Sequence, residues 1–261
     1  MSSSPLAVVT GASSGIGRAI ATSLAERGYR TVLIAREEGP LSGLAAALSA
    51  RAPSRALAFD LRALDSIPAL AEQILAEHGV PMVLVNNAGI GNYATFLEEP
   101  AARAREMMTL NYEAPAALLR GLLPAMLAAE PRRALPHVFN ISSMSARLGP
   151  WGHSGYAASK AALKSLSETL AQEVRGRARV TCVYPGIIRT AYFEKPSMAK
   201  LWPMVQRRAI APERVAAAVV GALGTGRTAL YVPRHYRMLD AIIAVSPRLA
   251  MRMVRGGSAA R

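Results

Sequence analysis

The sequence predicts an α/β fold in which helices cover both faces of a doubly wound parallel sheet. Short apolar runs alternate along the chain with helical patterns, which is the order typical of a parallel sheet. The run at 82–85 is apolar throughout, as expected for a strand that is covered on both faces. With 261 residues and 51% hydrophobic composition the chain can bury one substantial core, and no linker or low-complexity stretch divides it. We therefore expect a single α/β domain.

The chain opens with a strand, a glycine turn and a helix. An apolar run at 6–9 precedes the sequence TGASSGIG at 10–17, and a helical pattern follows at 18–27. Glycines let the backbone turn tightly and approach a ligand, and the first amide groups of a helix point at an anion. A dinucleotide pyrophosphate fits that place. Glycine turns after strands are common, so this segment alone leaves an ordinary turn open.

The later elements follow the same alternation. Further strands are expected at 31–35, 56–59, 82–85, 137–141, 180–184 and 229–232. The clearest helical patterns are expected at 101–127, 155–175 and 212–223. Gly224 and Gly226 end the last of these helices, because glycine is favoured just past a helix end.

A hydroxyl, a phenol and an amine come together in the segment 139–164. Tyr156 and Lys160 stand four residues apart in a predicted helix, so both side chains leave one face. A neighbouring ammonium favours a phenolate, so we expect Lys160 to lower the pKa of Tyr156. Ser143 follows the apolar run 137–141, where its hydroxyl can donate to a carbonyl oxygen. Pairs of this spacing also occur by chance in amphipathic helices.

Five motifs in a fixed order resemble the short-chain dehydrogenase/reductase family. They are T-G-x(3)-G-x-G at 10–17, Asn86-Asn87-Ala88-Gly89, Ser143, Tyr156-x-x-x-Lys160 and Pro185-Gly186. The resemblance covers about residues 5–235, which we expect to form the domain, with a substrate lid at about 191–211 and a tail at 236–261. It implies a Rossmann-type sheet of order 3-2-1-4-5-6-7 and hydride transfer between a nicotinamide and a carbonyl carbon.

The resemblance also implies roles for individual residues. The catalytic set comprises Asn111, Ser143, Tyr156 and Lys160. The cofactor is expected to contact Gly11, Ser13, Ser14, Gly15, Ile16, Gly17, Arg36, Asp60, Leu61, Asn87, Ala88, Gly89, Tyr156, Lys160, Pro185, Gly186, Ile188 and Thr190. The substrate is expected to contact Ser143, Trp151, His153, Tyr156, Tyr192 and Phe193. The main-chain carbonyl of Asn111 is expected to hold a water beside Lys160, although its helical setting alone suggests a surface residue.

The residue after the second strand favours NADP(H) over NAD(H). This chain has Ala35 where NAD-using members of the family carry an acid, and then Arg36, whose guanidinium can pair with a 2′-phosphate. A solvated surface arginine is the alternative, since Ser14 stands where other members have an additional basic residue. Asp60 matches the residue that bonds the adenine amino group, with a helix-cap role as its rival.

The substrate wall and lid suggest a bulky hydrophobic substrate. The segment 191–211 is rich in apolar residues, and its methionines adapt to irregular shapes, although these residues could equally cover the core. His153 is interpreted as a polar rim residue, because the Ser-Tyr-Lys set needs no second base. The four histidines lack paired spacing, so no metal site is expected.

The charge of +14 is concentrated toward the carboxyl end, because residues 195–261 carry 12 basic and two acidic residues, a net charge of +10. No aromatic residues interleave with the arginines and no DNA-binding motif occurs, so we exclude nucleic acid as a partner. Apolar and basic residues beyond 236 form an amphipathic pattern that suits an anionic membrane surface or a subunit interface. The start of the chain lacks a secretory-signal pattern, and the single Cys182 suits a reduced, cytoplasmic setting.

Together these observations predict an NADP(H)-dependent carbonyl reductase. Tyr156 is the expected acid/base, the expected partner is a small-molecule, apolar carbonyl substrate, and the resemblance implies a homodimer or homotetramer. An NAD-dependent alcohol dehydrogenase and a non-catalytic, nucleotide-binding scaffold or redox sensor are the alternatives. An intact Ser-Tyr-Lys-Asn set argues against the scaffold, because binding alone does not require all four residues.

Overall fold

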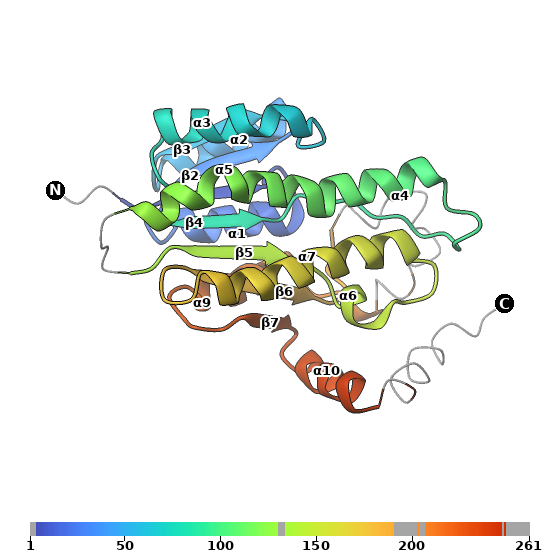
Figure 1. The fold of residues 1–261 in the computed structure, drawn as a ribbon. Coiled ribbons are helices and arrows are strands. Elements are labelled where there is room, and N and C mark those ends of the chain that lie inside the picture. The colour runs from blue at the N-terminus through green and yellow to red at the C-terminus, as the bar shows by residue number, and fades with distance from the viewer. Residues whose placement is uncertain (1–3, 130–133, 191–202, 204–206, 247, 249–261) are drawn as a thin grey trace.

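Seven parallel strands form one sheet in the order β3-β2-β1-β4-β5-β6-β7, which confirms the expected fold class (Figure 1). The computed structural model describes residues 4–129, 134–190, 203, 207–246 and 248. The strands are β1 (Leu6–Thr10), β2 (Arg30–Ala35), β3 (Ser54–Ala58), β4 (Val83–Asn86), β5 (His137–Ile141), β6 (Arg179–Pro185) and β7 (Ala229–Val232). The bounds of β5 and β7 coincide with the predicted ones, whereas β3 begins and ends earlier than expected.

Helices connect and cover these strands. They are α1 (Gly15–Ala25), α2 (Glu38–Ser49), α3 (Ile67–Glu77), α4 (Ala101–Met108), α5 (Ala114–Ala128), α6 (Ser145–Leu148), α7 (Ser154–Glu173), α9 (Pro212–Gly221) and α10 (Tyr236–Val245). A short 3₁₀ turn spans Leu64–Ser66, and a π-helical turn spans Thr109–Glu113.

Alternate residues of the strands lie on opposite faces of the sheet and pack into separate cores. In β1, Ala7 and Val9 join the core that includes α1, α2 and α9, whereas Leu6 and Val8 join the core beneath α3, α5 and α7. Both faces of the strand are thus buried, which is why the parallel strands have nearly continuous apolar sequences.

The direction of winding reverses between β1 and β4. β1 pairs with β2 on one side and with β4 on the other. At such a point the connections leave toward opposite faces of the sheet, and a crevice opens at the carboxyl ends of the strands. β1 ends at Thr10 and β4 at Asn86, so the crevice lies between the predicted glycine turn and the segment that begins at Asn87.

The helix expected at 101–127 differs from a continuous α-helix. The π-helical turn separates α4 from α5 and contains Asn111. A π-turn inserts one residue into the i→i−4 ladder and frequently marks a functional site. Pro115, two residues after the turn, lacks the amide hydrogen that a continuous α-helix would donate to the Asn111 carbonyl, although the apolar pattern of the segment continues across the interruption.

The part of the tail that the structure describes is a helix packed against the domain. α10 contacts both β7 and α6, and Figure 1 shows it beside the carboxyl edge of the sheet. Across the described ranges 4–129, 134–190 and 207–246, no helix has the length and apolarity needed to cross a membrane. The expected lid residues Tyr192 and Phe193 lie outside the described residues, as does most of the tail beyond 246.

Candidate active site

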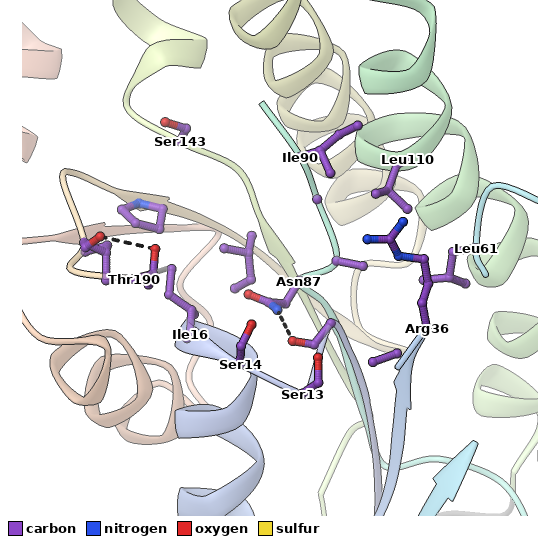
Figure 2. A pocket seen from close by; sticks show the side chains of 18 of the residues that line it. Ser13, Ser14, Ile16, Arg36, Leu61, Asn87, Ile90, Leu110, Ser143 and Thr190 are labelled. Carbon is purple, nitrogen blue, oxygen red and sulfur yellow. Dashed lines mark hydrogen bonds between the residues drawn. The ribbon is translucent and has the colours of Figure 1, made fainter. Parts of the chain in front are cut away.

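The glycine turn after β1 is fastened to the end of β4 by side-chain hydrogen bonds. The backbone amides of Asn87 and Ala88 both donate to the Thr10 hydroxyl, at 2.9 and 3.0 Å. The Asn87 side-chain amide in turn donates to the carbonyls of Thr10 and Gly11, at 3.0 and 3.2 Å. Figure 2 shows the Asn87 side chain with one of these bonds drawn. The predicted Thr-Gly and Asn-Asn motifs therefore form one rigid unit at the switch point of the sheet.

This unit has no room for side chains at its glycines. A Cβ on Gly17 would lie 2.2 Å from the Gly11 carbonyl oxygen and 2.4 Å from the Asn87 side-chain nitrogen. Gly11 itself has φ +63°, a conformation that side chains disfavour. Gly17 thus lies behind the turn and supports it, although we expected it to contact the cofactor.

The turn leads directly into the first turn of α1, which begins at Gly15. Ser14 precedes the helix in an extended conformation, so the free amides of α1 face the cavity beside the turn. Backbone amides at a helix start attract anions. The cradle therefore fits the pyrophosphate of a dinucleotide.

Arg36 lines the cavity beside the end of β2. It is exposed, and Figure 2 shows its side chain extending toward Leu61 and Leu110. Asp60 lines the cavity nearby and forms an ion pair with Arg62 at 2.6 Å. Hydrogen bonds from Arg62, with the charge of Arg36 adding to them, hold the pKa of Asp60 below its usual range. One of these bonds comes from the Arg62 backbone amide at 3.0 Å, which supports a local turn role for Asp60.

Ser143 and Tyr156 meet at the other side of the cavity. Ser143 follows β5, and Tyr156 lies in the first turn of α7. Burial raises the pKa of Tyr156, and its hydrogen bond with Ser143 lowers it by less. The net direction is opposite to the one expected from Lys160, because desolvation of the phenolate outweighs the stabilising contacts. The phenol is therefore protonated at neutral pH.

Lys160 lines the cavity and is almost fully buried, with 4% of its surface exposed. Its ammonium donates to the Ile141 carbonyl oxygen at 2.8 Å, and its own backbone carbonyl accepts from the Ser142 hydroxyl at 2.9 Å. Burial lowers the pKa of Lys160 to about 8. The same burial that disfavours the Tyr156 anion thus disfavours the Lys160 cation.

Asn111 is fully buried, so the interpretation as a helix-surface residue is wrong. Its side chain accepts from the Ile90 amide at 2.9 Å and donates to the Ile90 carbonyl at 2.8 Å. It also donates to the Ser159 hydroxyl at 2.9 Å. A Cβ on Gly89 would lie 2.9 Å from the Asn111 side-chain oxygen and 3.2 Å from the Lys160 nitrogen, so only glycine fits between them.

The glycine turn, Arg36, Ser143, Tyr156 and Lys160 line one cavity of about 650 Å³, whereas Asn111 and Gly17 are not among its lining residues. Its predicted lining residues are Gly11, Ser13, Ser14, Gly15, Ile16, Arg36, Asp60, Leu61, Asn87, Ala88, Gly89, Ser143, Tyr156, Lys160, Pro185, Gly186, Ile188 and Thr190. The sequence reasoning missed several others, among them Pro40, Phe59, Ile90 and Leu110. Phe59 and Ile90 adjoin predicted residues, so their position next to those motifs is the signal that could have found them.

Trp151 and His153 lie outside this cavity, in the turn between α6 and α7. Their rings contact Tyr93, which the sequence reasoning did not select, at centroid distances of 5.6 and 5.1 Å. Burial lowers the pKa of His153, so its imidazole is neutral at neutral pH. Within the described part of the chain, no group of three histidine, cysteine or acidic side chains is placed to hold a metal ion.

The tail helix α10 is fastened to the site, a connection that the sequence reasoning also missed. Asp240 forms an ion pair with Arg147 of α6 and accepts a hydrogen bond of 2.5 Å from the Tyr231 hydroxyl. The ring of Tyr236 packs on Gly186, where a Cβ would lie 2.3 Å from it. α10 therefore supports both the segment after Ser143 and the Pro185-Gly186 wall of the cavity.

Comparison with known proteins places these features in a family. A family model described as short chain dehydrogenase matches residues 5–200. The NADPH-dependent pterin aldehyde reductase of Arabidopsis thaliana is 35% identical over 190 residues, which cover 70% of this chain and 74% of that protein.

Solved structures extend the likeness over nearly the whole chain. A short-chain dehydrogenase from Streptomyces avermitilis is 34% identical with a TM-score of 0.78, covering 96% of this chain and 98% of that one. A short-chain dehydrogenase/reductase from Burkholderia phymatum, in complex with NAD, is 25% identical with a TM-score of 0.85, covering 95% and 96%. These relatives include one named for NADPH and one bound to NAD, so they leave the choice between the two open.

Proposed function

Because this chain belongs to the short-chain dehydrogenase/reductase family and is an NAD(P)-dependent oxidoreductase, we propose that it reduces the carbonyl group of an apolar substrate with NADPH. The observation that carries the proposal is the placement of Ser143, Tyr156 and Lys160 around one cavity with the glycine turn. The nicotinamide, when bound, supplies the hydride that a carbonyl carbon accepts.

In this proposal each side chain of the set has one task. The Ser143 hydroxyl donates a hydrogen bond to the carbonyl oxygen of the substrate and polarises it. Tyr156 then gives its proton to that oxygen, a role that suits a phenol whose pKa is raised by burial. Lys160, with a pKa lowered to about 8, still carries its charge at neutral pH and stabilises the tyrosinate that remains.

Asn111 and the glycine turn complete the machinery. The bonds from Asn111 to Ile90 hold the loop after β4 against the cavity, and its main-chain carbonyl lies in the π-helical turn. We assign that carbonyl to a water path from Lys160 to the solvent, which would restore the proton. The amides at the start of α1 would hold the pyrophosphate.

A Tyr156→Phe variant tests the proposed acid. We expect turnover of an apolar ketone to fall by a factor of about 10² or more, while NADPH still binds, since acid–base groups typically contribute that much. Tyr29→Phe is the matched control, because Tyr29 packs against the core on the α1 side of the sheet. Near-normal turnover in Tyr156→Phe would refute the assignment.

The preference for NADP(H) rests on Arg36. The exposed guanidinium lines the cavity and can pair with a 2′-phosphate through two hydrogen bonds. We expect NADPH to bind at least tenfold tighter than NADH, a ratio that corresponds to about 1.4 kcal/mol, and Arg36→Asp to reverse the order. Titrations that follow nicotinamide fluorescence measure both. Tighter binding of NADH to the unaltered protein would favour the second candidate, an NAD-dependent alcohol dehydrogenase, which the NAD complex of the Burkholderia relative supports.

Assembly and location are part of the proposal. Proteins of this family typically form oligomers, which supports a homodimer or homotetramer, and light scattering on a sizing column measures the mass directly. The cytoplasmic setting and the alternative of a membrane-bound tail stay predictions. Salt-washing a membrane fraction distinguishes them, because protein found wholly in the first supernatant rules out the membrane.

A further inference from the structure

Two loops contact each other at the mouth of the site. One is the loop at 91–99 between β4 and α4, and the other is the turn at 149–153 between α6 and α7, both at the carboxyl end of the sheet (Figure 1). The Ala94 amide donates to the Gly152 carbonyl at 2.9 Å. The Glu99 carboxylate accepts from the Gly155 amide at 3.1 Å, next to Tyr156. The two loops are thereby held in a fixed relation to the proposed acid.

Four rings form a continuous row across these loops. The centroids of Trp151 and Tyr93 are 5.6 Å apart, those of Tyr93 and His153 are 5.1 Å apart, and those of His153 and Tyr156 are 6.0 Å apart. These spacings lie in the range of favourable aromatic contacts. We call these four residues the aromatic row. It begins at Tyr156, the proposed acid, and ends at Trp151, which is 59% exposed.

The backbone is shaped to keep Tyr93 in the row. Gly152 has φ +73°, and a Cβ there would lie 2.7 Å from the Tyr93 ring. Glycine is therefore needed both for the turn and for the approach of the ring. Tyr93 is only partly buried, so part of its surface remains exposed.

The row carries no charge at neutral pH. Burial lowers the pKa of His153, and its Nδ1 contacts the Trp151 carbonyl oxygen at 3.1 Å, which requires the proton on that nitrogen. Burial also raises the pKa of Tyr93. An uncharged strip of ring surface in a chain with only 5% aromatic residues is suited to an apolar group that also presents a π-face.

We propose that the aromatic row recognises an aryl group on the substrate, and that Tyr93 is a specificity-determining residue of this site. The inference rests on the proposed carbonyl reduction and names its substrate class: ketones or aldehydes with an aromatic ring a few bonds from the carbonyl carbon. With the carbonyl oxygen at the hydroxyl of Tyr156, such a ring lies beside His153 and Tyr93. The competing explanation is that the rings only fasten the two loops to each other.

A pair of matched ketones separates these explanations. 4-Phenyl-2-butanone and 4-cyclohexyl-2-butanone have the same chain, and two methylenes insulate the carbonyl from the ring, so their intrinsic reactivity is alike. We expect the protein to favour the phenyl compound in kcat/KM, and Tyr93→Leu to reduce that preference by about 3- to 10-fold, the size of an aromatic pair contact. Phe96→Leu is the matched control. Phe96 lies in the same loop, 79% exposed, and no ring contact among the described residues joins it to the row.

Tyr93→Phe separates recognition from loop fastening. This variant keeps the ring and removes only the hydroxyl, so we expect it to retain the preference for the phenyl compound. Loss of the preference in Tyr93→Phe, or an unchanged preference in Tyr93→Leu, would overturn the proposal. A protein that does not favour the phenyl compound at all would overturn it as well.

Binding measured without turnover distinguishes this inference from the proposed function. Calorimetric titration of both ketones into the protein with NADP⁺ gives their dissociation constants in a complex that cannot react. If the phenyl compound binds more tightly and Tyr93→Leu loses this difference, the role of the aromatic row is supported. This holds even if neither ketone is reduced, because the absence of reduction would count against the proposed function only. Equal binding of both ketones would overturn the row while leaving reduction intact.

Discussion

Replacing Lys160 by methionine is expected to change how the stability of the cofactor-free protein depends on pH. The Lys160 ammonium is buried, and its pKa is lowered from 10.5 to about 8. Below pH 8 the ammonium is charged in both the folded and the unfolded protein, so the full cost of burying it opposes folding. Methionine has a similar unbranched shape and no charge, and it removes that cost.

The sign and size of the effect follow from proton linkage. Between pH 8 and 10.5 the unfolded chain holds a proton on Lys160 that the folded protein has released, so the free energy of unfolding rises with pH. Each unit of pKa shift is equivalent to about 1.36 kcal/mol. From pH 7 to 9.5 the protein should therefore gain about 2 kcal/mol relative to Lys160→Met.

Urea unfolding at several pH values between 7 and 9.5 measures this difference. Other groups that titrate in the window are present in both proteins and cancel in the comparison. Lys164→Met is the matched control, because Lys164 lies on the same helix, keeps 19% of its side chain exposed and pairs its ammonium with the Glu168 carboxylate at 2.6 Å. Parallel curves for the protein and Lys160→Met would refute the reasoning, whatever their vertical offset.

Two further substitutions test the supports of the site. Gly17→Ala should abolish cofactor binding and destabilise the fold by about 1–3 kcal/mol, because its Cβ would lie 2.2 Å from the Gly11 carbonyl oxygen. Nicotinamide fluorescence measures the binding and urea unfolding measures the stability. Intact binding would show that the glycine turn can shift to accommodate the Cβ. Asp240→Asn should lower the free energy of unfolding by about 1–3 kcal/mol, because it leaves Arg147 without its carboxylate partner. An unchanged midpoint of urea unfolding would show that the packing of α10 does not depend on this ion pair.

The local pattern of the sequence was enough to predict the sheet and the cofactor cradle. The strand, glycine turn and helix at the start of the chain are defined by residues close together in sequence, and so is the Asn-Asn-Ala-Gly segment after β4. Parallel strands joined by right-handed connections bring such segments to one edge of the sheet. The site residues from Gly11 to Thr190 that share the cavity were therefore predictable from the motifs and their order.

Contacts between distant segments were not predictable in this way. Arg147 and Asp240 are 93 positions apart, and nothing in either local sequence indicates the other. Tyr93 lies in a loop without periodicity, so its contact with Trp151 depends on how two loops close against each other. Asn111 occupies an interruption of a helix that the helical pattern conceals.

The sequence by itself determined the order of the strands, the glycine turn and the spacing that places Tyr156 and Lys160 on one face of α7. Only the tertiary structure decided in which direction the pKa of each of these two residues is shifted. Spacing shows that an ammonium can approach a phenol, and it suggested a lowered pKa for Tyr156. Burial acts on both groups and raises the pKa of the phenol while lowering that of the amine. Desolvation depends on every atom packed around a group, which only the folded chain specifies.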